Sequence, residues 1–220
     1  AYAFDSAVRD RFPATKKVWG DLRPPGRVLD FGCGNGVLTY WLSCNGFGNE
    51  VIGVDVSNTG IANAQKCFSR PSVQYLHASR VPEMVAEKKI FDAVVSSHVL
   101  EHIPSPEKVL AELLPLGEWF VIEVPLEDCL WPNFHYAIRG KQRRENSLGH
   151  VNFWNKKTFR RFIEENGLMI VRDFHYASAP FSPYSSPVKR LVERVALGIL
   201  GLSIYSRLMA THYAVLARRT

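Results

Sequence analysis

An apolar run that ends in an acid and three alternating glycines is the strongest chemical signal in the sequence. Residues 28–36 read VLDFGCGNG, which places Asp30 ahead of Gly32, Gly34 and Gly36. Glycines allow positive φ angles and let a ligand come close to the main chain. The helix expected after this turn adds free N–H groups and a partial positive charge at its N-terminus. The pattern predicts a site for a nucleoside-bearing cofactor, with a turn that binds no ligand as the alternative.

The spacing of the glycines indicates which cofactor is bound. Dinucleotide sites follow G-x-G-x-x-G, in which the third glycine lets the helix pack closely against the strand. Here the third glycine comes one residue early, at Gly36, and Val37 stands in the dinucleotide position. Asp30 would also repel a phosphate, whereas it suits a positive charge. The turn therefore favours a cationic cofactor over a pyrophosphate.

A second acid stands where a ribose would be bound. The segment VIGVD ends at Asp55, and an acid about 20 residues beyond such a glycine turn can accept hydrogen bonds from the ribose hydroxyls. The alternative role for Asp55 is the N-cap of the following helix. Ser57 and Asn58 are better placed for that role.

Alternating strand-like and helix-like segments must position these residues. The alternation predicts an α/β fold with a doubly wound, mostly parallel sheet that is covered by helices on both faces. The expected strands are residues 27–31, 50–55, 72–77, 91–96, 118–124, 168–174 and 211–217. The expected helices are residues 5–19, 36–45, 58–68, 80–88, 104–114, 156–166 and 188–208. Such sheets bind their ligands at the carboxyl ends of the strands.

Three motifs in combination resemble the class I S-adenosylmethionine (SAM)-dependent methyltransferases of the small-molecule type. They are D-x-G-x-G-x-G at residues 30–36, Asp55, and the block LEHI at residues 100–103. The resemblance covers roughly residues 25–175 and 211–217. It implies a Rossmann-like sheet of seven strands with the last strand antiparallel, SAM as the cofactor and S-adenosylhomocysteine as its product. The cofactor contacts that it implies come from Asp30, Gly32, Cys33, Gly34, Gly36, Asp55, Val56, Ala78, Ser79, Ser96 and Ser97.

The turn after the third strand departs from the family pattern. Members often carry an acid there that bonds the adenine amino group, whereas this chain has Ala78 and Ser79. A backbone N–H at this turn or the hydroxyl of Ser79 could bond the adenine instead.

Two histidines are candidate catalytic residues. The resemblance places His98 after the fourth strand, facing the transferred methyl group, and His150 just before the helix at 156–166. Imidazole titrates near neutral pH, so either histidine could act as a general base, and His150 could instead bind the acceptor. For both, a structural role is the alternative, and we expect His77 and His102 to be structural.

Two segments fall outside the common core of the family. Residues 126–150 are aromatic and then basic, which predicts a substrate-binding or lid insert that suits an acceptor with an acidic portion. The second segment, residues 177–208, contains a helix at 188–208. Its part 195–202 is apolar nearly all round and is flanked by Lys189, Arg190, Arg194 and Arg207. We expect this helix to be buried against the sheet or a dimer partner. The alternative is a helix on a membrane surface, near a lipid-linked substrate.

Length and composition restrict the number of domains and the cellular compartment that we expect. The 220 residues fit a single domain, and no apolar run approaches the ~20 residues of a membrane span. The four cysteines lack C-x-x-C spacing, which predicts free thiols in the reducing cytoplasm. No signal peptide is evident. The net charge of +6 permits an acidic partner, and the acids form no evident metal-ligand cluster, so we expect no metal.

These features predict an enzyme that transfers a methyl group from SAM to a small-molecule acceptor. An oxygen is the favoured target, on a sugar, a quinone precursor or another metabolite. Such an enzyme mainly has to align nucleophile, methyl carbon and sulfur. Two other functions remain: a non-catalytic SAM-binding scaffold or partner protein, and an NAD-dependent oxidoreductase, against which Asp30 and Gly36 count. A nucleic-acid substrate is not expected, because residues 96–99 read SSHV and lack an Asn/Asp-Pro-Pro-Tyr/Phe tetrad.

Overall fold

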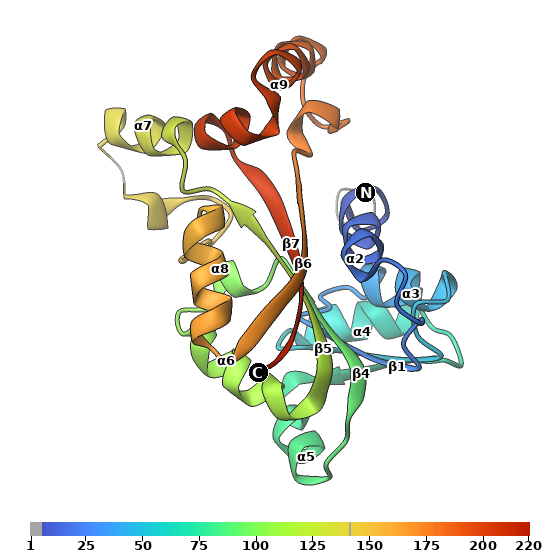
Figure 1. Cartoon of the computed structure of the whole chain (residues 1–220). Helices are drawn as coiled ribbons and strands as arrows, with labels where there is room; N and C mark the ends of the chain where they lie inside the picture. Colours follow the sequence, from blue (N-terminus) through green and yellow to red (C-terminus); the bar gives the residue numbers. More distant parts are fainter. Residues whose placement is uncertain (1–5, 141) are drawn as a thin grey trace.

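Seven strands form one twisted sheet through the centre of the molecule (Figure 1). The computed structural model describes residues 6–140 and 142–220. The strands are β1 (Arg27–Phe31), β2 (Glu50–Asp55), β3 (Val73–His77), β4 (Phe91–Ser97), β5 (Gly117–Leu126), β6 (Leu168–Tyr176) and β7 (Thr211–Arg219). They lie in the order β3-β2-β1-β4-β5-β7-β6, and β7 is antiparallel to both of its neighbours. The predicted fold class, with its antiparallel last strand, is confirmed.

Helices cover both faces of the sheet. Their bounds are η1 (Ala7–Arg11, a π-helical turn), α2 (Phe12–Trp19), α3 (Val37–Cys44), α4 (Asn58–Cys67), α5 (Val81–Ala86), α6 (Pro106–Leu113), α7 (Leu130–Ile138), α8 (Lys156–Glu165) and α9 (Pro187–Leu208). Helices α2, α3 and α4 lie on one side of the sheet, and α5, α6 and α8 lie on the other (Figure 1). Each predicted helix is present within a few residues of its expected bounds, although residue 5 lies outside the described residues. Helix α7 was not predicted.

The strands are apolar on both sides because each side meets a layer of helices. On β1, Val28 belongs to the core formed with α2 and α3, and the next residue, Leu29, belongs to the core formed with α5, α6 and α8. Val95 and Val94 on β4 divide between the two cores in the same way. Successive strand residues point to opposite faces, so a sheet covered on both faces needs continuous apolar runs.

The parallel strands deliver the candidate residues to one edge of the sheet. The register pairs Phe31 at the end of β1 with Val54 on β2, and Ser97 at the end of β4 with Glu123 on β5. The glycine turn follows β1 and Asp55 ends β2. The residues proposed to act on a cofactor therefore converge from different parts of the chain at the carboxyl edge.

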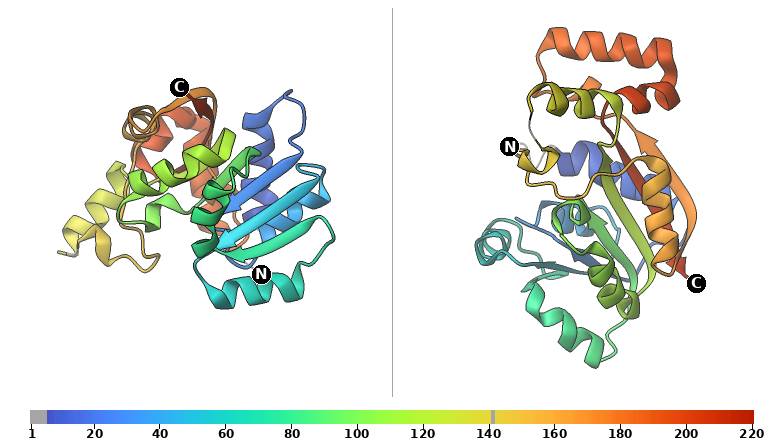
Figure 2. Two further views of the ribbon diagram at one scale, coloured as in Figure 1. Left: turned by 90° about the horizontal axis from the view of Figure 1, so that it is seen from below. Right: turned by 90° about the vertical axis from the view of Figure 1, so that its left-hand side faces the viewer.

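The connection from β6 to β7 leaves the sheet instead of crossing it. Since β6 and β7 are antiparallel neighbours, no helix has to run across a sheet face to join them. Helix α9 lies beyond the sheet, near α7 (Figure 2), and is interrupted at Gly201, where φ is 67°. Its apolar side chains include Leu191 and Ile199, which are 63% and 78% exposed. The prediction that this helix is buried against the sheet is therefore wrong, while contact with a second copy or with a membrane stays a prediction.

Candidate active site

The glycine turn has the backbone that its spacing predicts. Gly32, Gly34 and Gly36 have φ angles of 79°, 53° and 80°, a region that glycine enters at no steric cost. A Cβ on Gly32 would lie 2.3 Å from Cγ2 of Val99. The turn is also bound to the second strand, because the N–H of Gly32 donates to the carbonyl of Val54 at 2.8 Å. A side chain at position 32 would therefore displace either the turn or the residues after β4.

The carboxylate of Asp55 anchors the glycine turn through a hydrogen bond. Its Oδ2 atom accepts the N–H of Gly34 at 2.8 Å, and its Oδ1 atom accepts the N–H of Ser57 at 2.8 Å. The N-cap of α4 is Ser57, whose hydroxyl accepts the N–H of Gly60 at 3.0 Å. Asp55 is thus not the cap. Each of its carboxylate oxygens keeps a lone pair for a further donor.

A cavity of about 300 Å³ opens above the ends of β1, β2 and β4. It brings together five of the predicted site residues, which come from four separate segments of the chain. Its lining consists of Phe31, Gly32, Val54, Asp55, Val56, Ala78, His98, Val99, His102 and Ile103. One carboxylate and two imidazoles thus border an otherwise largely apolar space.

Asp30 lies beneath the turn and does not line this cavity. Its carboxylate is buried and accepts a 2.6 Å hydrogen bond from the hydroxyl of Thr39 on α3. Burial raises the pKa of Asp30 to about 6, although the hydrogen bond from Thr39 opposes that shift. A direct contact between Asp30 and a cationic ligand stays a prediction.

Four other predicted residues have side chains that are buried or bonded away from the cavity, although the buried hydroxyl of Ser96 has no hydrogen-bond partner among the described residues. The hydroxyl of Ser79 lies 2.9 Å from Nδ1 of His77, so it is committed to a local contact. Cys33 is buried against α4, and Ser96 is buried within β4. Ser97 donates to Oε2 of Glu123 at 2.7 Å. Contact with a cofactor at these four positions would fall to the backbone, and this stays a prediction, as it does for Gly34 and Gly36.

His98 is held in an unusual backbone conformation at the cavity. Its φ is 58°, which is uncommon for a residue with a Cβ and marks a position that its surroundings determine. Its N–H donates to the carbonyl of Glu123 at 2.9 Å. The imidazole Nδ1 lies 3.3 Å from Oε1 of Glu101, and Nε2 lies 3.2 Å from Nδ1 of His212. Both ring nitrogens are therefore engaged.

We call His98, Glu123, His212, Tyr176 and Ser97 the closed cluster, because its polar groups bond one another. The carboxylate of Glu123 accepts a hydrogen bond from Tyr176 on one oxygen and from Ser97 on the other. The ring of Tyr176 also stacks on that of His212, with centroids 5.2 Å apart. Strands β4, β5, β6 and β7 thus all contribute to one hydrogen-bonded unit beside the cavity.

Charge in the closed cluster follows from this geometry. Burial alone would lower the pKa of His98, but the adjacent carboxylates of Glu101 and Glu123, 3.3 and 3.8 Å from its ring nitrogens, raise it to about 9. Burial would raise the pKa of Glu123, but the bond and charge of His98 lower it to about 2. Burial and the charge of His98 lower the pKa of His212 to about 4. At neutral pH, His98 is therefore protonated, and it becomes a base only if positive charge in the cavity lowers its pKa.

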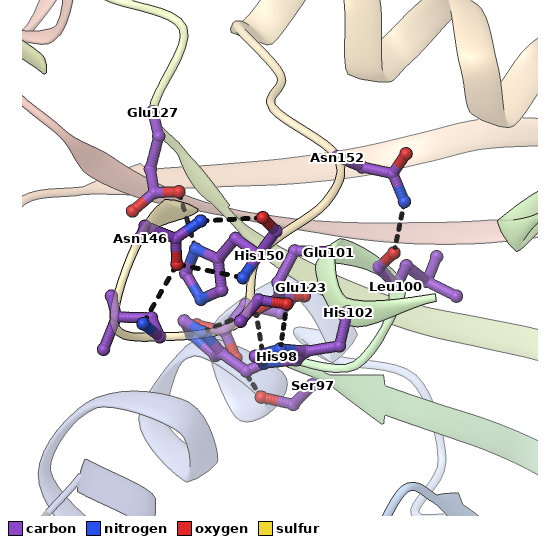
Figure 3. A network of polar contacts seen from close by, with 12 residues as sticks. Ser97, His98, Leu100, Glu101, His102, Glu123, Glu127, Asn146, His150 and Asn152 are labelled. Carbon is purple, nitrogen blue, oxygen red and sulfur yellow. Dashed lines mark hydrogen bonds and ion pairs between the residues drawn. The ribbon is translucent and has the colours of Figure 1, made fainter. Parts of the chain in front are cut away.

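A second group of titratable residues lies next to the first (Figure 3). We call Glu101, His102 and His150 the open cluster. Glu101 and His102 belong to the 3₁₀ turn η3 (Leu100–His102), and His150 comes from the loop before α8. The rings of His102 and His150 have centroids 4.8 Å apart, and Nδ1 of His150 lies 2.6 Å from Oε2 of Glu127. The structure thus brings the predicted His150 beside His102, which was expected to be structural.

The motifs did not reveal Glu101, Glu123, Glu127 or His212. One signal was available, because Glu123 interrupts the apolar segment Val121–Val124 and an acid inside a central strand needs buried partners. His212 has no comparable signal, since it joins the cluster only through the pairing of β7 with β5.

Comparison with known sequences identifies relatives of this chain. A family model described as "Methyltransferase domain" matches residues 6–173. A ubiquinone biosynthesis O-methyltransferase of Burkholderia vietnamiensis is 37% identical over 100 residues, which are 42% of this chain and 41% of that protein. The enzyme of the same name from Burkholderia pseudomallei is 27% identical over 158 residues, 67% of this chain and 66% of that protein. The chain thus spans between two fifths and two thirds of the curated relatives that it matches.

Solved structures share the fold at low sequence identity. A SAM-dependent methyltransferase from Anabaena variabilis has a TM-score of 0.66 at 17% identity, covering 99% of this chain and 86% of the other. Phosphoethanolamine N-methyltransferase 2 of Haemonchus contortus, in complex with SAM, has a TM-score of 0.61 at 15% identity, covering 99% and 56%. Among the described residues, none of the helices has both the length and the apolar character that spanning a membrane requires.

Proposed function

The chain belongs to the SAM-dependent methyltransferases, and we propose that it transfers a methyl group from SAM to an oxygen atom of a small-molecule acceptor. The observation that carries the proposal is the cavity of about 300 Å³ at the carboxyl edge, which the glycine turn, Asp55 and His98 border. The oxygen is supported by the O-methyltransferases that are 27% and 37% identical to parts of the chain.

The residues around the cavity suit SAM. Asp55 offers two carboxylate oxygens, each with a lone pair left for a ribose hydroxyl. Val56, Ala78 and Ile103 provide apolar walls for the adenine ring, and the glycine turn adds no side chain that would fill the space. Carboxylates also suit the positive charges of SAM, which has no phosphate to repel. When bound, SAM supplies an electrophilic methyl group on a sulfonium.

The residues of the chain would bind and orient the reactants. Val99 and the glycine turn limit how deeply a ligand can bind between β1 and β4. The closed cluster fixes the ring of His98 at the wall of the cavity, with a proton on each nitrogen at neutral pH. His102 lines the same cavity, and Nε2 of His102 and of His150 has no hydrogen-bond partner among the described residues. We infer that these two imidazoles face the acceptor hydroxyl.

The surroundings of the site support an acceptor with an anionic head and an apolar tail. A hollow of about 920 Å³ near the ends of β5 and β6 is lined by Lys156, Lys157, Arg160 and Arg207 and by the acid Asp128. Lys156 and Arg160 pair with Asp173, which leaves Lys157 and Arg207 without an acidic partner among the described residues. An apolar groove of about 490 Å³ between α7 and α9 shares Leu130 with this hollow. A lipid-linked acceptor could place an anionic head in the basic hollow and an apolar tail in the groove.

A transfer experiment with isotope-labelled SAM tests the proposed reaction. Purified protein is incubated with methyl-labelled SAM and either a hydroxylated aromatic lipid with an acidic group or its amine analogue. Mass spectrometry should find the label on the hydroxyl compound. Label on the amine alone would contradict O-methylation. SAM binding without transfer to any acceptor would support a non-catalytic SAM-binding protein instead.

Variants of Asp55 test the cofactor site by calorimetry. Asp55→Ala should weaken SAM binding by about 2–3 kcal/mol, because it removes a charged acceptor of two hydrogen bonds. Asp55→Asn should lose less, since one oxygen remains. Asp92→Ala is the matched control, because its carboxylate also accepts two backbone N–H groups, at 2.7 Å each, but at the opposite edge of the sheet. Equal SAM affinity in Asp55→Ala and Asp92→Ala would refute the role of Asp55.

A further inference from the structure

We propose that the open cluster, Glu101, His102 and His150, is a binding site for a divalent transition-metal ion of the zinc type. The three side chains each offer one ligand atom, and these atoms lie within 4.8 Å of one another. Two imidazoles and one carboxylate form a donor set that zinc and related ions prefer. No ligand cluster is evident in the sequence, because His150 is far from the other two along the chain.

The carboxylate of Glu101 provides the first argument. Its side chain is 0% exposed, and neither carboxylate oxygen has a hydrogen-bond partner among the described residues. The nearest basic atoms are Nδ1 of His98 at 3.3 Å and Nε2 of His102 at 4.0 Å. The protonated ring of His98 faces Oε1 as an ion pair, but neither oxygen receives a well-aligned hydrogen bond, and Oε2 has no partner at all among the described residues. A buried carboxylate oxygen without a donor is unfavourable. A bound cation would supply the missing partner.

The hydrogen bonds of the two histidines provide the second argument. Nδ1 of His102 lies 3.3 Å from the carbonyl of Gly149, and Nδ1 of His150 lies 2.6 Å from the carboxylate of Glu127. Both contacts place the ring proton on Nδ1 and leave Nε2 as an acceptor. Metal-binding histidines typically donate their second nitrogen to a carboxylate or a carbonyl in this way. The partners that would orient a pair of metal ligands are therefore already in place.

The backbone joins the two segments that carry the ligands. The carbonyl of Glu101 accepts the N–H groups of Val151 and Asn152 at 2.8 and 3.1 Å. The side-chain amide of Asn152 donates to the carbonyls of Leu100 and Ile103 at 2.9 and 2.6 Å (Figure 3 draws the first). The loop is thus held against η3, which keeps His150 near the other ligands before any ion binds.

The site borders the proposed methyl-transfer cavity through His102. Three protein ligands leave a coordination position for water or for an oxygen of the acceptor. A hydroxyl bound there would lose its proton to bulk water more readily, with the electron pair staying on the oxygen. This use of the ion rests on the proposed function, whereas the metal site itself does not.

Metal binding can be tested without an activity assay. Full-length protein is treated with chelator, dialysed and titrated with CoCl₂, whose visible absorption reports bound Co²⁺, and then with ZnCl₂ by calorimetry. We expect wild-type protein to bind both ions. Glu101→Gln should weaken zinc binding more than about 100-fold, and Glu127→Gln, which replaces the charged partner of His150 with a neutral amide, by about 10- to 100-fold. His212→Gln in the closed cluster is the matched control and should bind zinc as wild type does.

The outcomes separate this proposal from the methyl-transfer proposal. Wild-type protein that binds SAM but neither metal ion overturns the metal site and leaves the methyl-transfer proposal intact. Zinc affinity that is equal in wild type, Glu101→Gln and Glu127→Gln also overturns it. If circular dichroism shows that Glu101→Gln does not fold, Glu127→Gln decides, because it replaces a partly exposed side chain whose one hydrogen bond among the described residues is to His150. Zinc binding with no methyl transfer supports the site and contradicts the proposed function.

Discussion

The closed and open clusters are neighbours of similar composition, yet their polar groups are used in opposite ways. In the closed cluster, Glu123 receives hydrogen bonds on both carboxylate oxygens, and His98 and His212 bond each other. In the open cluster, Glu101 is equally buried but receives none. Composition alone therefore does not distinguish a structural network from a ligand site. The distinction comes from asking where each buried donor and acceptor finds its partner.

The two clusters also differ in the elements that carry them. Side chains of the closed cluster come mainly from strands of the sheet, β4, β5, β6 and β7. Those of the open cluster come from a 3₁₀ turn and a loop. Strands fix a network in one arrangement, whereas a turn and a loop can adjust by the small distance that binding an ion requires. The contrast assigns stability to one cluster and ligand binding to the other, and four predictions test it.

The largest expected effect separates the two buried glutamates. Glu123→Leu should lower the free energy of unfolding by about 3–5 kcal/mol, because it leaves Tyr176 and Ser97 without their buried acceptor and removes a negative charge beside His98. Glu101→Leu should cost less in chelator-treated protein, because the Glu101 carboxylate receives no hydrogen bond and His98 keeps Glu123 as a nearby acid. Urea unfolding in the presence of a chelator measures both. Equal losses would abolish the distinction between the clusters.

Added zinc should stabilise the protein through the open cluster only. At a free zinc concentration 100 times the dissociation constant, an ion that binds the folded state alone raises the free energy of unfolding by about 2.7 kcal/mol. Thermal unfolding with and without zinc should show this gain in wild type and in His212→Gln. Glu101→Gln should show almost none. A gain that disappears in His212→Gln and persists in Glu101→Gln would assign the ion to the closed cluster.

Acid should weaken the fold through His212. The pKa of His212 is about 4 in the folded chain, against an ordinary value of 6.5. Between these two values the unfolded chain binds more protons, so stability is lost as the pH falls from 6.5 towards 4. His98, with a pKa of about 9, and Glu123, with a pKa of about 2, keep their charges throughout this window.

His212→Gln should remove a loss of about 3 kcal/mol over that range. Urea unfolding at several pH values between 6.5 and 4 checks this, with His135→Gln on α7, away from the closed cluster, as a control. A pH profile that is identical in wild type and His212→Gln would show that His212 is not held neutral by its surroundings.

The smallest expected effect tests how well the closed cluster tolerates the loss of one donor. Tyr176→Phe should cost about 1 kcal/mol of stability, because Glu123 keeps the bond from Ser97 and the aromatic stack on His212 remains. Combining it with Ser97→Ala in a double-mutant cycle measures whether the two donors act together. Strict additivity would mean that they do not form a connected network.

The fold could be predicted in most of its parts because its signals are local. The inner strands β2 and β4 contain apolar runs, as strands covered on both faces must, whereas the edge strand β6 also carries Arg172, Asp173 and His175. Gly32 and Gly36 marked the turn because a side chain at either position would strike Val99 or Ala64. The parallel order then carries Asp55 and His98 to the same edge without any further information from the sequence.

The parts that escaped prediction depend on contacts distant in sequence or on exceptions to local rules. Helix α7 contains Pro132, which suggests a break, but proline is tolerated in the first turn of a helix. Helix α9 is apolar enough to suggest burial, but whether it is buried depends on the antiparallel pairing of β6 and β7. The two clusters assemble side chains from several separate segments, and no spacing rule connects Glu123 with His212 or Glu101 with His150.

The pairing of Tyr176 with His212 fixes the point at which the chain departs from the sheet and returns to it. The chain therefore leaves the sheet at the end of β6 and rejoins it at the start of β7, at one place. The segment between these strands, which includes α9, is an appendage inserted at a single junction. An appendage of this kind can be lengthened, shortened or exchanged while the register of all seven strands is kept. The apolar groove proposed to hold the acceptor lies partly on this appendage, so swapping it between related proteins would test whether it selects the acceptor.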